Sequence, residues 1–428
     1  MHADQGNHLA YLTNAMMFAY IDPTTTSTLL YVLIGVAASV GYACRGFFYQ
    51  LRDVLLSSKT GKTAADDELV FYSEGRQYWP VFEPVLRALD EKGVGYLYVS
   101  SDADDPGLKR TGEKVHTRYV SPNLTPPYLN HLKAKVVVMT TPQLDVLTIR
   151  RSKRVNHYVH LVHAPTDFTT YRKFAFDHFD TVMCAGPHQV KSARYLEELR
   201  GYPPKQLLET GCTYYDGLVK TLEERRRQMT PEPKPRPVVL VAPTWKPYGF
   251  LNRFGKQMVE SLLAADKWDV IFRPHPQTAV SFPEVLDDMR RTFEGRAHFT
   301  LDTAPNGAAS MDRADMMISE LSGIVFDYAF TQGKPTLIFN GSPDLRGFEA
   351  EDFDCEMWEV AVRNQIGVEF GTEDIPGICA LVEKTLQRSA GDLASFRDAN
   401  IYNFGKAGPV AAQQVIEILD AVRKEGLK

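Results

Sequence analysis

The chain has 428 residues, with 48 lysines and arginines against 53 aspartates and glutamates, so its formal net charge is −5. This balance excludes a nucleic-acid binder that works through bulk positive charge. An apolar share of 44% and a charged share of 24% are ordinary for a globular protein, and the length allows two domains. Five scattered cysteines without CxxC or metal-type spacing suit a reducing compartment and indicate neither a disulfide framework nor a zinc site.

The N-terminal part contains one long apolar run, Thr28–Cys44, which carries no charged residue. Phe47–Tyr49 extends the apolar character past Arg45, and counted from Ile21, with Asp22 at its edge, the segment could just cross a bilayer of about 30 Å. Acidic residues precede it and basic residues follow it, namely Asp4 and Asp22 before, and Arg45, Arg52, Lys59 and Lys62 after. The positive-inside rule therefore places the C-terminal side in the cytoplasm.

No basic n-region precedes the apolar run, so a cleavable signal peptide is not expected. We expect residues 1–60 to form a membrane-anchor segment with a transmembrane helix. The protein would then lie at the cell membrane, with its catalytic domains on the cytoplasmic side. The alternative is an amphipathic or buried helix that packs on the globular part.

From Asp66 onward, short apolar runs alternate with stretches of helical periodicity. The predicted strands are 69–72, 96–99, 136–139, 158–162, 181–184, 238–241, 270–272, 314–318 and 336–339, and the predicted helices are 79–91, 188–199, 212–222, 256–265, 283–293, 324–330 and 410–424. The proline-rich segment Pro231–Pro237 is typical of a stiff linker. The expected fold class is α/β, with two Rossmann-like domains, 66–228 and 236–428, facing a cleft.

Two predicted strands of the second domain end in polar residues. Arg273 and His275 follow strand 270–272 in the sequence Arg-Pro-His-Pro, and Ser322-Gly323 joins strand 314–318 to a helix. A Ser-Gly turn at a helix start offers backbone N–H groups and a positive dipole end, which bind phosphate. Taken singly, the turn is only an N-cap and the other motif only a loop. Together, at the ligand-binding edge of an open sheet, they suggest a diphosphate-containing substrate.

The first domain supplies a second histidine candidate. His160 and His163 lie in and just after strand 158–162, and alternation places them on opposite faces. His163 is at the strand end, where substrate could approach, and a histidine of near-neutral pKa suits deprotonation of an alcohol. His160 lies inside the apolar run and is better explained as a core histidine.

These motifs resemble the CDP-glycerol:poly(glycerophosphate) glycerophosphotransferases, the family of teichoic-acid primases and polymerases. Members of that family combine WHGTP-like, APTW/R, (R/M)PHP and (T/S)D-x-SS-x-x-FDY motifs with a later KP. The matching segments here are Leu161–Pro165, Ala242–Lys246, Arg273–Pro276, Ser319–Tyr328 and Lys334-Pro335. Their order and rough spacing hold from about Asp66 to the C-terminus. The resemblance implies a glycosyltransferase-B-type fold.

The resemblance also implies roles for single residues. His163 would take the proton from the acceptor hydroxyl, and His275 would contact the diphosphate of a CDP-alditol and stabilise charge on the departing CMP. The other implied positions are Ser322 and the Gly323 amide for phosphate, Thr244 for phosphate, Arg273 for further positive charge or a structural ion pair, Asp327 for ribose hydroxyls or for orienting a neighbour, and Trp245 for shaping the acceptor side or packing.

The implied function is a membrane-associated transferase that moves glycerol phosphate, or a related polyol phosphate, from a CDP-linked donor to a hydroxyl acceptor, with release of CMP. Its partners would be the CDP-alditol, a lipid-linked or polymer acceptor and the membrane, with no nucleic acid. Two DxD sequences, Asp102–Asp104 and Asp352–Asp354, lie away from the family motifs. We interpret them as solvated surface, so no metal and no cofactor are expected.

The chain departs from the family pattern at several positions. Val162 and Ala164 replace the tryptophan and glycine that flank the first histidine, and the lysine usual after the proline is absent from Thr166–Phe168. Glu320 and Gly323 replace the aspartate and second serine of the helix-start motif. Two alternatives therefore stay open: a sugar-nucleotide glycosyltransferase or epimerase on the same fold, and a non-catalytic membrane-tethered scaffold.

Overall fold

The computed structural model describes residues 34–36, 39, 41, 68–228, 234–245, 249–304, 306–342, 344–388 and 391–425. The chain divides into Met1–Asp66 and Asp67–Lys428, and the fold below is that of the second unit. The expected membrane segment lies almost entirely outside the described residues, as does the 231–233 part of the expected linker. Among the residues that the structure describes, no helix is both long enough and apolar enough to cross a bilayer.

The first half of this unit is built on a seven-stranded sheet in the order β3-β2-β1-β4-β5-β6-β7. All neighbouring strands are parallel. Their bounds are β1 Leu69–Ser73, β2 Tyr96–Ser100, β3 Val115–Tyr119, β4 Ala134–Met139, β5 Val155–Leu161, β6 Thr181–Cys184 and β7 Gln206–Glu209. The order turns back on itself at β1 and β4, as in a doubly wound sheet.

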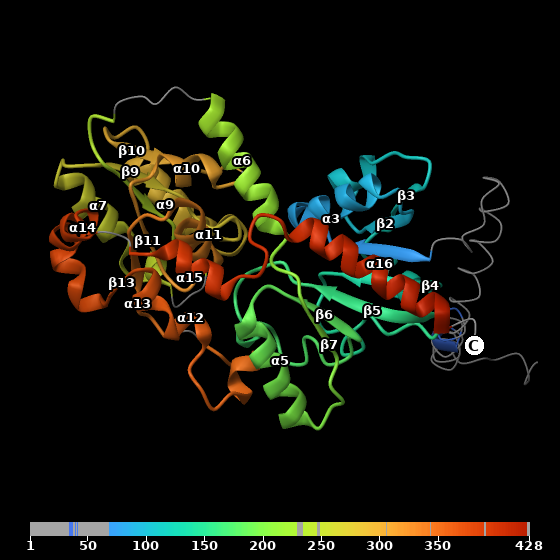
Figure 1. Ribbon diagram of the computed structural model, residues 1–428. Helices are drawn as coiled ribbons and strands as arrows, with labels where there is room; N and C mark the ends of the chain where they lie inside the picture. Colours follow the sequence, from blue (N-terminus) through green and yellow to red (C-terminus); the bar gives the residue numbers. More distant parts are fainter. Residues whose placement is uncertain are drawn as a thin grey trace, which may run out of the picture. The chain divides into compact units, whose positions relative to one another are not determined.

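The second half repeats the plan with a six-stranded parallel sheet in the order β10-β9-β8-β11-β12-β13. The strands are β8 Val238–Val241, β9 Asp269–Phe272, β10 Phe299–Leu301, β11 Met316–Ser319, β12 Thr336–Phe339 and β13 Val368–Phe370. Here the reversal falls between β8 and β11. Two parallel α/β sheets confirm the expected pair of Rossmann-like domains (Figure 1).

Helices connect the strands. In the first half they are α3 Trp79–Glu91, α4 Thr125–Asn130, α5 Pro187–Arg200 and α6 Tyr214–Gln228. In the second half they are α7 Lys256–Ala264, α8 Thr278–Ser281, α9 Pro283–Phe293, α10 Ala308–Arg313, α11 Gly323–Gln332, α12 Trp358–Ala361, α13 Arg363–Ile366, α14 Ile378–Leu386, α15 Leu393–Asn400 and α16 Ala407–Glu425. Short helical turns are η1 Arg76–Tyr78, η2 Pro106–Lys109, η3 Phe168–Thr170, η4 Leu251–Gly255, η5 Glu349–Asp352 and η6 Thr372–Gly377.

Local sequence explains where the helices start and stop. Helix α5 begins at Pro187, whose missing N–H and fixed φ suit the first helical turn. It ends at Gly201, which has a left-handed φ of 65° that costs a glycine little. Helix α3 buries Phe82, Val85 and Leu86 against the first sheet, as its helical periodicity predicts.

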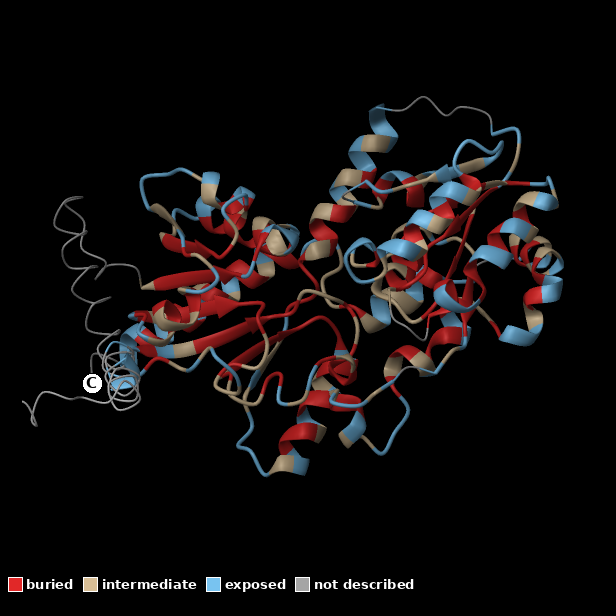
Figure 2. Cartoon of the chain, turned by 180° about the vertical axis from the view of Figure 1, so that it is seen from behind, coloured by how far each residue is buried: buried red, intermediate tan, exposed pale blue. Residues whose placement is uncertain are grey.

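Three buried clusters hold the fold together, and both sheets are buried along most of their strands (Figure 2). One cluster packs α3 and α16 on one face of the first sheet. Another packs α7, α9 and α14 on a face of the second sheet. The third is continuous from the other face of the first sheet to β8, β11 and α11. The C-terminal helix α16, within the expected domain 236–428, thus packs against α3 of the first sheet (Figure 1).

Candidate functional site

The predicted motifs of the second half meet at one edge of its sheet. Ala242–Trp245 follows β8, Glu320–Gly323 follows β11, and Arg273–His275 follows β9. Since β9, β8 and β11 are consecutive neighbours in a parallel sheet, these segments all leave from the carboxyl edge, on and beside the strand reversal. That is where doubly wound sheets bind ligands.

Glu320 joins two of these segments and was not predicted to do so. Its Oε1 accepts the backbone N–H of Thr244 at 2.8 Å, and its Oε2 accepts that of Phe250 at 3.1 Å. The carboxyl is buried, and burial raises its pKa to about 7. The replacement of the family's aspartate therefore has a structural consequence, because Glu320 fixes the loop after β8 against the loop after β11.

The start of α11 has the features of an anion site. Ser322 is the N-cap in an extended conformation, and within the described part of the chain its side chain makes no capping hydrogen bond. The space at Gly323 is open, since a Cβ built there would meet no described atom within 4 Å. The first turn therefore presents backbone N–H groups beside a serine hydroxyl that the helix does not use.

His275 has a defined tautomer. Its Nδ1 accepts the backbone N–H of Gln277 at 3.1 Å, so the proton of the neutral ring lies on Nε2. The residue is exposed, and its ring lies 6.4 Å from that of Trp245. Thus the structure brings the Arg-Pro-His-Pro and Ala-Pro-Thr-Trp segments together, with an N–H donor at an exposed position.

Arg273 and Asp327 are both engaged by protein groups. Arg273 is buried and pairs with Asp302 at 2.7 Å, with a second hydrogen bond to the carbonyl of Ala304. Asp327 accepts a hydrogen bond from the Tyr214 hydroxyl at 3.3 Å, and burial raises its pKa to about 7. These are the ion-pair and neighbour-orienting alternatives named from the sequence, and contact of either residue with the donor stays a prediction.

His163 lies just past the end of β5, in an aromatic setting. Its Nδ1 is 3.4 Å from the hydroxyl of Tyr171, and its ring packs edge-on against those of Tyr78 and Tyr171 at 5.3 and 5.5 Å. Burial lowers the pKa of His163 to about 4. At neutral pH the imidazole is therefore uncharged and able to accept a proton, though as a weaker base than an ordinary histidine.

The sequence places His160 in the core, and the structure does the same. The residue is fully buried and packs against Phe176 and Phe179, with ring centroids 4.7 and 5.0 Å away. Neither ring nitrogen has a hydrogen-bond partner among the described residues. Burial lowers its pKa well below the ordinary value, so His160 is a neutral core ring.

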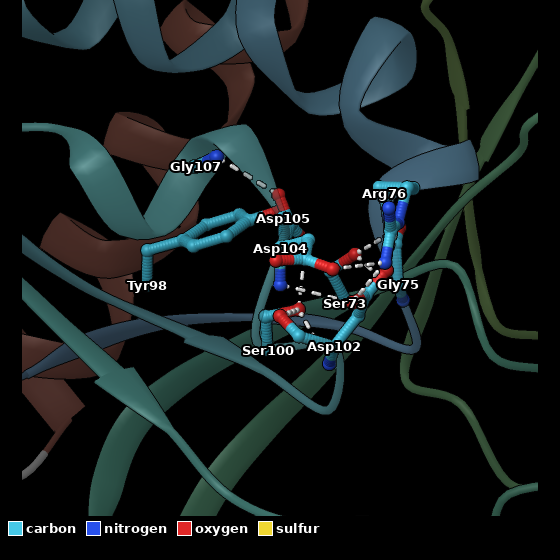
Figure 3. A network of polar contacts seen from close by, with 9 residues as sticks. All are labelled: Ser73, Gly75, Arg76, Tyr98, Ser100, Asp102, Asp104, Asp105 and Gly107. Atoms are coloured by element: carbon cyan, nitrogen blue, oxygen red, sulfur yellow. Dashed lines mark hydrogen bonds and ion pairs between the residues drawn. The ribbon is translucent and has the colours of Figure 1, made fainter.

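The two DxD sequences lie at the surface, as interpreted, with Asp104 and Asp354 exposed and Asp102 and Asp352 half-buried, but three of the four aspartates are in ion pairs. Asp102 and Asp104 both bind the Arg76 guanidinium, at 2.6 and 2.8 Å (Figure 3). Asp352 pairs with Lys173 at 2.6 Å and with Arg200 at 2.9 Å. Short carboxylate spacing in a polar stretch cannot reveal such partners, which come from distant segments. In the described ranges, no three metal-ligating side chains gather into a site.

Three residues near the candidate site escaped the sequence analysis. Glu320 was noted only as a departure from the family pattern, and neither Tyr171 nor Glu74 was singled out. Glu74 directly follows β1, at the reversal of the first sheet. The available signal was its place one residue past a buried strand, in the sequence Ser-Glu-Gly.

Two doubly wound sheets in one chain have the architecture of the glycosyltransferase-B-type fold. Solved structures support this class. The chain resembles the wall teichoic acid polymerase TagF, with a TM-score of 0.54, 16% identity and coverage of 89% of this chain and 98% of that one. It also resembles UDP-GlcNAc 2-epimerase from Methanocaldococcus jannaschii, with a TM-score of 0.51, 12% identity and coverage of 82% and 99%. At these identities the similarity is one of fold.

The chain also resembles UDP-GlcNAc 2-epimerase from Neisseria meningitidis bound to UDP-GlcNAc. The TM-score is 0.54 at 13% identity, and the match covers 82% of this chain and 99% of that one. A search of curated proteins found no match. The family profile for CDP-glycerol:poly(glycerophosphate) glycerophosphotransferase, however, matches residues 57–352. The chain therefore belongs to the CDP-glycerol:poly(glycerophosphate) glycerophosphotransferase family and is a transferase of this type, as the motifs predicted.

Proposed function

We propose that the protein transfers glycerol phosphate, or a related polyol phosphate, from a CDP-linked donor to a hydroxyl acceptor in cell-surface polymer synthesis, with release of CMP. One observation carries this proposal. The open helix start at Ser322-Gly323 and the exposed side chain of His275, whose neutral ring carries its proton on Nε2, lie at the same edge of the second sheet. Together they suit a diphosphate.

The chemistry follows from the charges that develop. An acceptor oxygen attacks the β-phosphorus, the bond from that phosphorus to the bridging oxygen breaks, and CMP leaves with the electron pair. His163 takes the acceptor proton as its neutral ring becomes imidazolium. His275 and the first turn of α11 donate hydrogen bonds to the phosphate oxygens, where negative charge accumulates.

The printed descriptions of the structural relatives agree with this donor and polymer. TagF is described as a wall teichoic acid polymerase, and one of its variants was soaked with CDPG. A teichoic-acid-type polymer is therefore the product class that we propose here.

Membrane association is the second part of the proposal, supported by the apolar run Thr28–Cys44. A basic surface of the described chain adds to this support. The loops 130–134 and 148–154, before β4 and β5, are joined by hydrogen bonds. They expose Lys133, Arg150, Lys153 and Arg154, next to Leu147 with 58% of its surface exposed. Basic side chains around an apolar one suit an anionic membrane surface.

The test is CMP release from CDP-glycerol by detergent-solubilised full-length protein, with and without a membrane-lipid extract. Release that requires the extract supports the CDP-linked donor and a lipid-linked acceptor. Absence of release, together with no thermal shift on adding CDP-glycerol, would contradict the proposed donor. UDP-sugars would then be tested, because the epimerase-like fold accommodates them in its relatives.

A further inference from the structure

The carboxyl edge of the first sheet contains a carboxylate that no ion pair uses. Glu74 directly follows β1 and is exposed. Its carboxyl forms no ion pair with any lysine or arginine of the described chain, although Arg76 is only two residues away. The surrounding protein removes enough water from this carboxyl to raise its pKa above the ordinary value.

Arg76 is unavailable to Glu74 because two aspartates already bind it (Figure 3). The Arg76 guanidinium donates to both carboxyl oxygens of Asp102 at 2.6 and 2.9 Å, and to Asp104 at 2.8 Å. The same network fixes the backbone around Glu74, since Gly75 N–H donates to the Ser73 hydroxyl at 3.2 Å. The Arg76 guanidinium is therefore already engaged by Asp102 and Asp104.

Hydroxyl groups surround Glu74. Extending the β1–β4 register by two residues pairs Glu74 with Thr141, and the two share one face of the sheet because side chains alternate. The Thr141 hydroxyl is buried and lies close to the Glu74 carboxyl. Tyr78 also lies near the Glu74 carboxyl, and its ring packs against that of His163.

We propose that Glu74 and Thr141 form the acceptor subsite and bind the hydroxyl groups of a polyol, which holds one hydroxyl next to His163. A carboxylate accepts two hydrogen bonds from neighbouring hydroxyls, and a threonine hydroxyl can donate a third to the polyol. Because no lysine or arginine of the described chain pairs with Glu74, its carboxylate keeps lone pairs that the hydroxyls of a ligand can use. This inference deepens the proposed function, on which it rests, by naming the acceptor class as a polyol with adjacent hydroxyls.

The experiment has a binding arm and a kinetic arm, both with the full-length protein. In the binding arm, saturation-transfer NMR measures glycerol and ribitol on wild type, Glu74→Gln and Thr141→Val, without any nucleotide. In the kinetic arm, CMP release is measured against the amount of membrane-lipid extract. Glu113→Gln is the matched control, because Glu113 is an exposed glutamate outside this edge.

We expect both site variants to weaken polyol binding about tenfold or more, which is the scale of hydrogen bonds to charged groups. The apparent KM for the extract should rise equally, while the KM for CDP-glycerol and the melting temperature stay unchanged. Wild type that fails to bind polyols, or Glu74→Gln that binds them as tightly as wild type, would overturn the inference. Wild type that binds polyols but releases no CMP would refute the proposed reaction and leave the subsite supported.

Discussion

The two sheets present opposite environments at their carboxyl edges. At the first sheet His163 is enclosed by the rings of Tyr78 and Tyr171, and burial lowers its pKa to about 4. At the second sheet His275 is exposed, and a backbone N–H at its Nδ1 leaves Nε2 as a donor. Removal of water lowers the pKa of His163, whereas a hydrogen bond at Nδ1 sets the tautomer of His275.

This difference matches the two tasks of a phosphoryl-type transfer. A base must be neutral before the reaction, and a low-dielectric environment keeps it so. A group that stabilises a diphosphate must be reachable by a large anionic donor, which favours an open edge with N–H donors and a helix start. Deprotonation of the acceptor and stabilisation of the diphosphate therefore depend on different environments, and substitutions at one sheet edge at a time should affect them separately.

The largest expected effect is at the enclosed site. We expect His163→Asn to lower kcat by about 10²–10⁴-fold, the range of general-base contributions, while binding of CDP-glycerol stays unchanged. His131→Asn is the control, since His131 is an exposed histidine of the same half. Steady-state CMP release and donor titration measure the two quantities. A loss under about threefold, far below this range, would remove His163 as the base.

The pH dependence of the rate tests the enclosure itself. A base with a pKa of about 4 stays neutral from pH 8 down to pH 5, so kcat/KM should be nearly constant there. A histidine with an ordinary pKa near 6.5 would instead lose about thirtyfold by pH 5 through protonation. A fall of about thirtyfold in kcat/KM between pH 8 and pH 5 would show that the His163 ring is solvated. The two histidines would then not differ in environment as described above.

The second effect is at the open site. We expect His275→Ala to lower kcat/KM about a hundredfold, which corresponds to about 2.7 kcal/mol of transition-state stabilisation. Because the residue is exposed, the melting temperature should not change. His298→Asn is a suitable control, as His298 is an exposed histidine of the same half with a left-handed φ of 64° that asparagine tolerates. A change under about threefold would exclude His275 from the reaction.

Ser322→Ala should have a smaller effect of about tenfold on the KM for CDP-glycerol, the scale of one hydrogen bond to a charged group. The same variant distinguishes a role of Ser322 in binding CDP-glycerol from a role as the N-cap of α11. Loss of a capping serine costs about 1 kcal/mol, yet Ser322 makes no side-chain capping bond within the described residues, so the melting temperature should hold. Ser281→Ala is the control. A lower melting temperature with an unchanged KM would mean that Ser322 is only an N-cap.

The sequence predicts the centre of each sheet better than its edges, for a physical reason. Central strands such as β6 and β8 are buried on both faces and appear as continuous apolar runs. The strands missed from the sequence are all at sheet edges, namely β3, β7, β10 and β13. Edge strands are short or carry polar residues, as in Val-His-Thr-Arg-Tyr and Val-Glu-Phe, so hydrophobic runs do not reveal them.

In the candidate site, too, some features could be predicted from the sequence and others could not. The motif loops could be placed at strand ends because strand and helix patterns flank them. The partners of Arg76 and the bonds of Glu320 could not, since they depend on how loops 26 and 76 residues apart approach each other. The packing of α16 was equally hidden, because an amphipathic pattern shows that a helix has an apolar face but not which sheet covers it.

The smallest expected effect tests how far the dry environment of the first half extends. Glu359, on α12, accepts the backbone N–H of Asp167. Burial, and then the charge of Asp167, raise the pKa of Glu359 to about 8. The folded state therefore binds more protons than the unfolded state between about pH 4.5 and 8, so stability falls as the pH rises through that window.

We expect Glu359→Gln to flatten this decline, giving a melting temperature a few degrees above wild type at pH 9 and little difference at pH 5. Glutamine keeps the oxygen that accepts from Asp167 and cannot ionise, so it mimics the protonated acid. The exposed Glu356→Gln is the control within the same segment. If the melting temperatures of Glu359→Gln and wild type change with pH in the same way between pH 5 and pH 9, water reaches Glu359. The low-dielectric region would then end at the rings around His163 and would not extend to the loop after it.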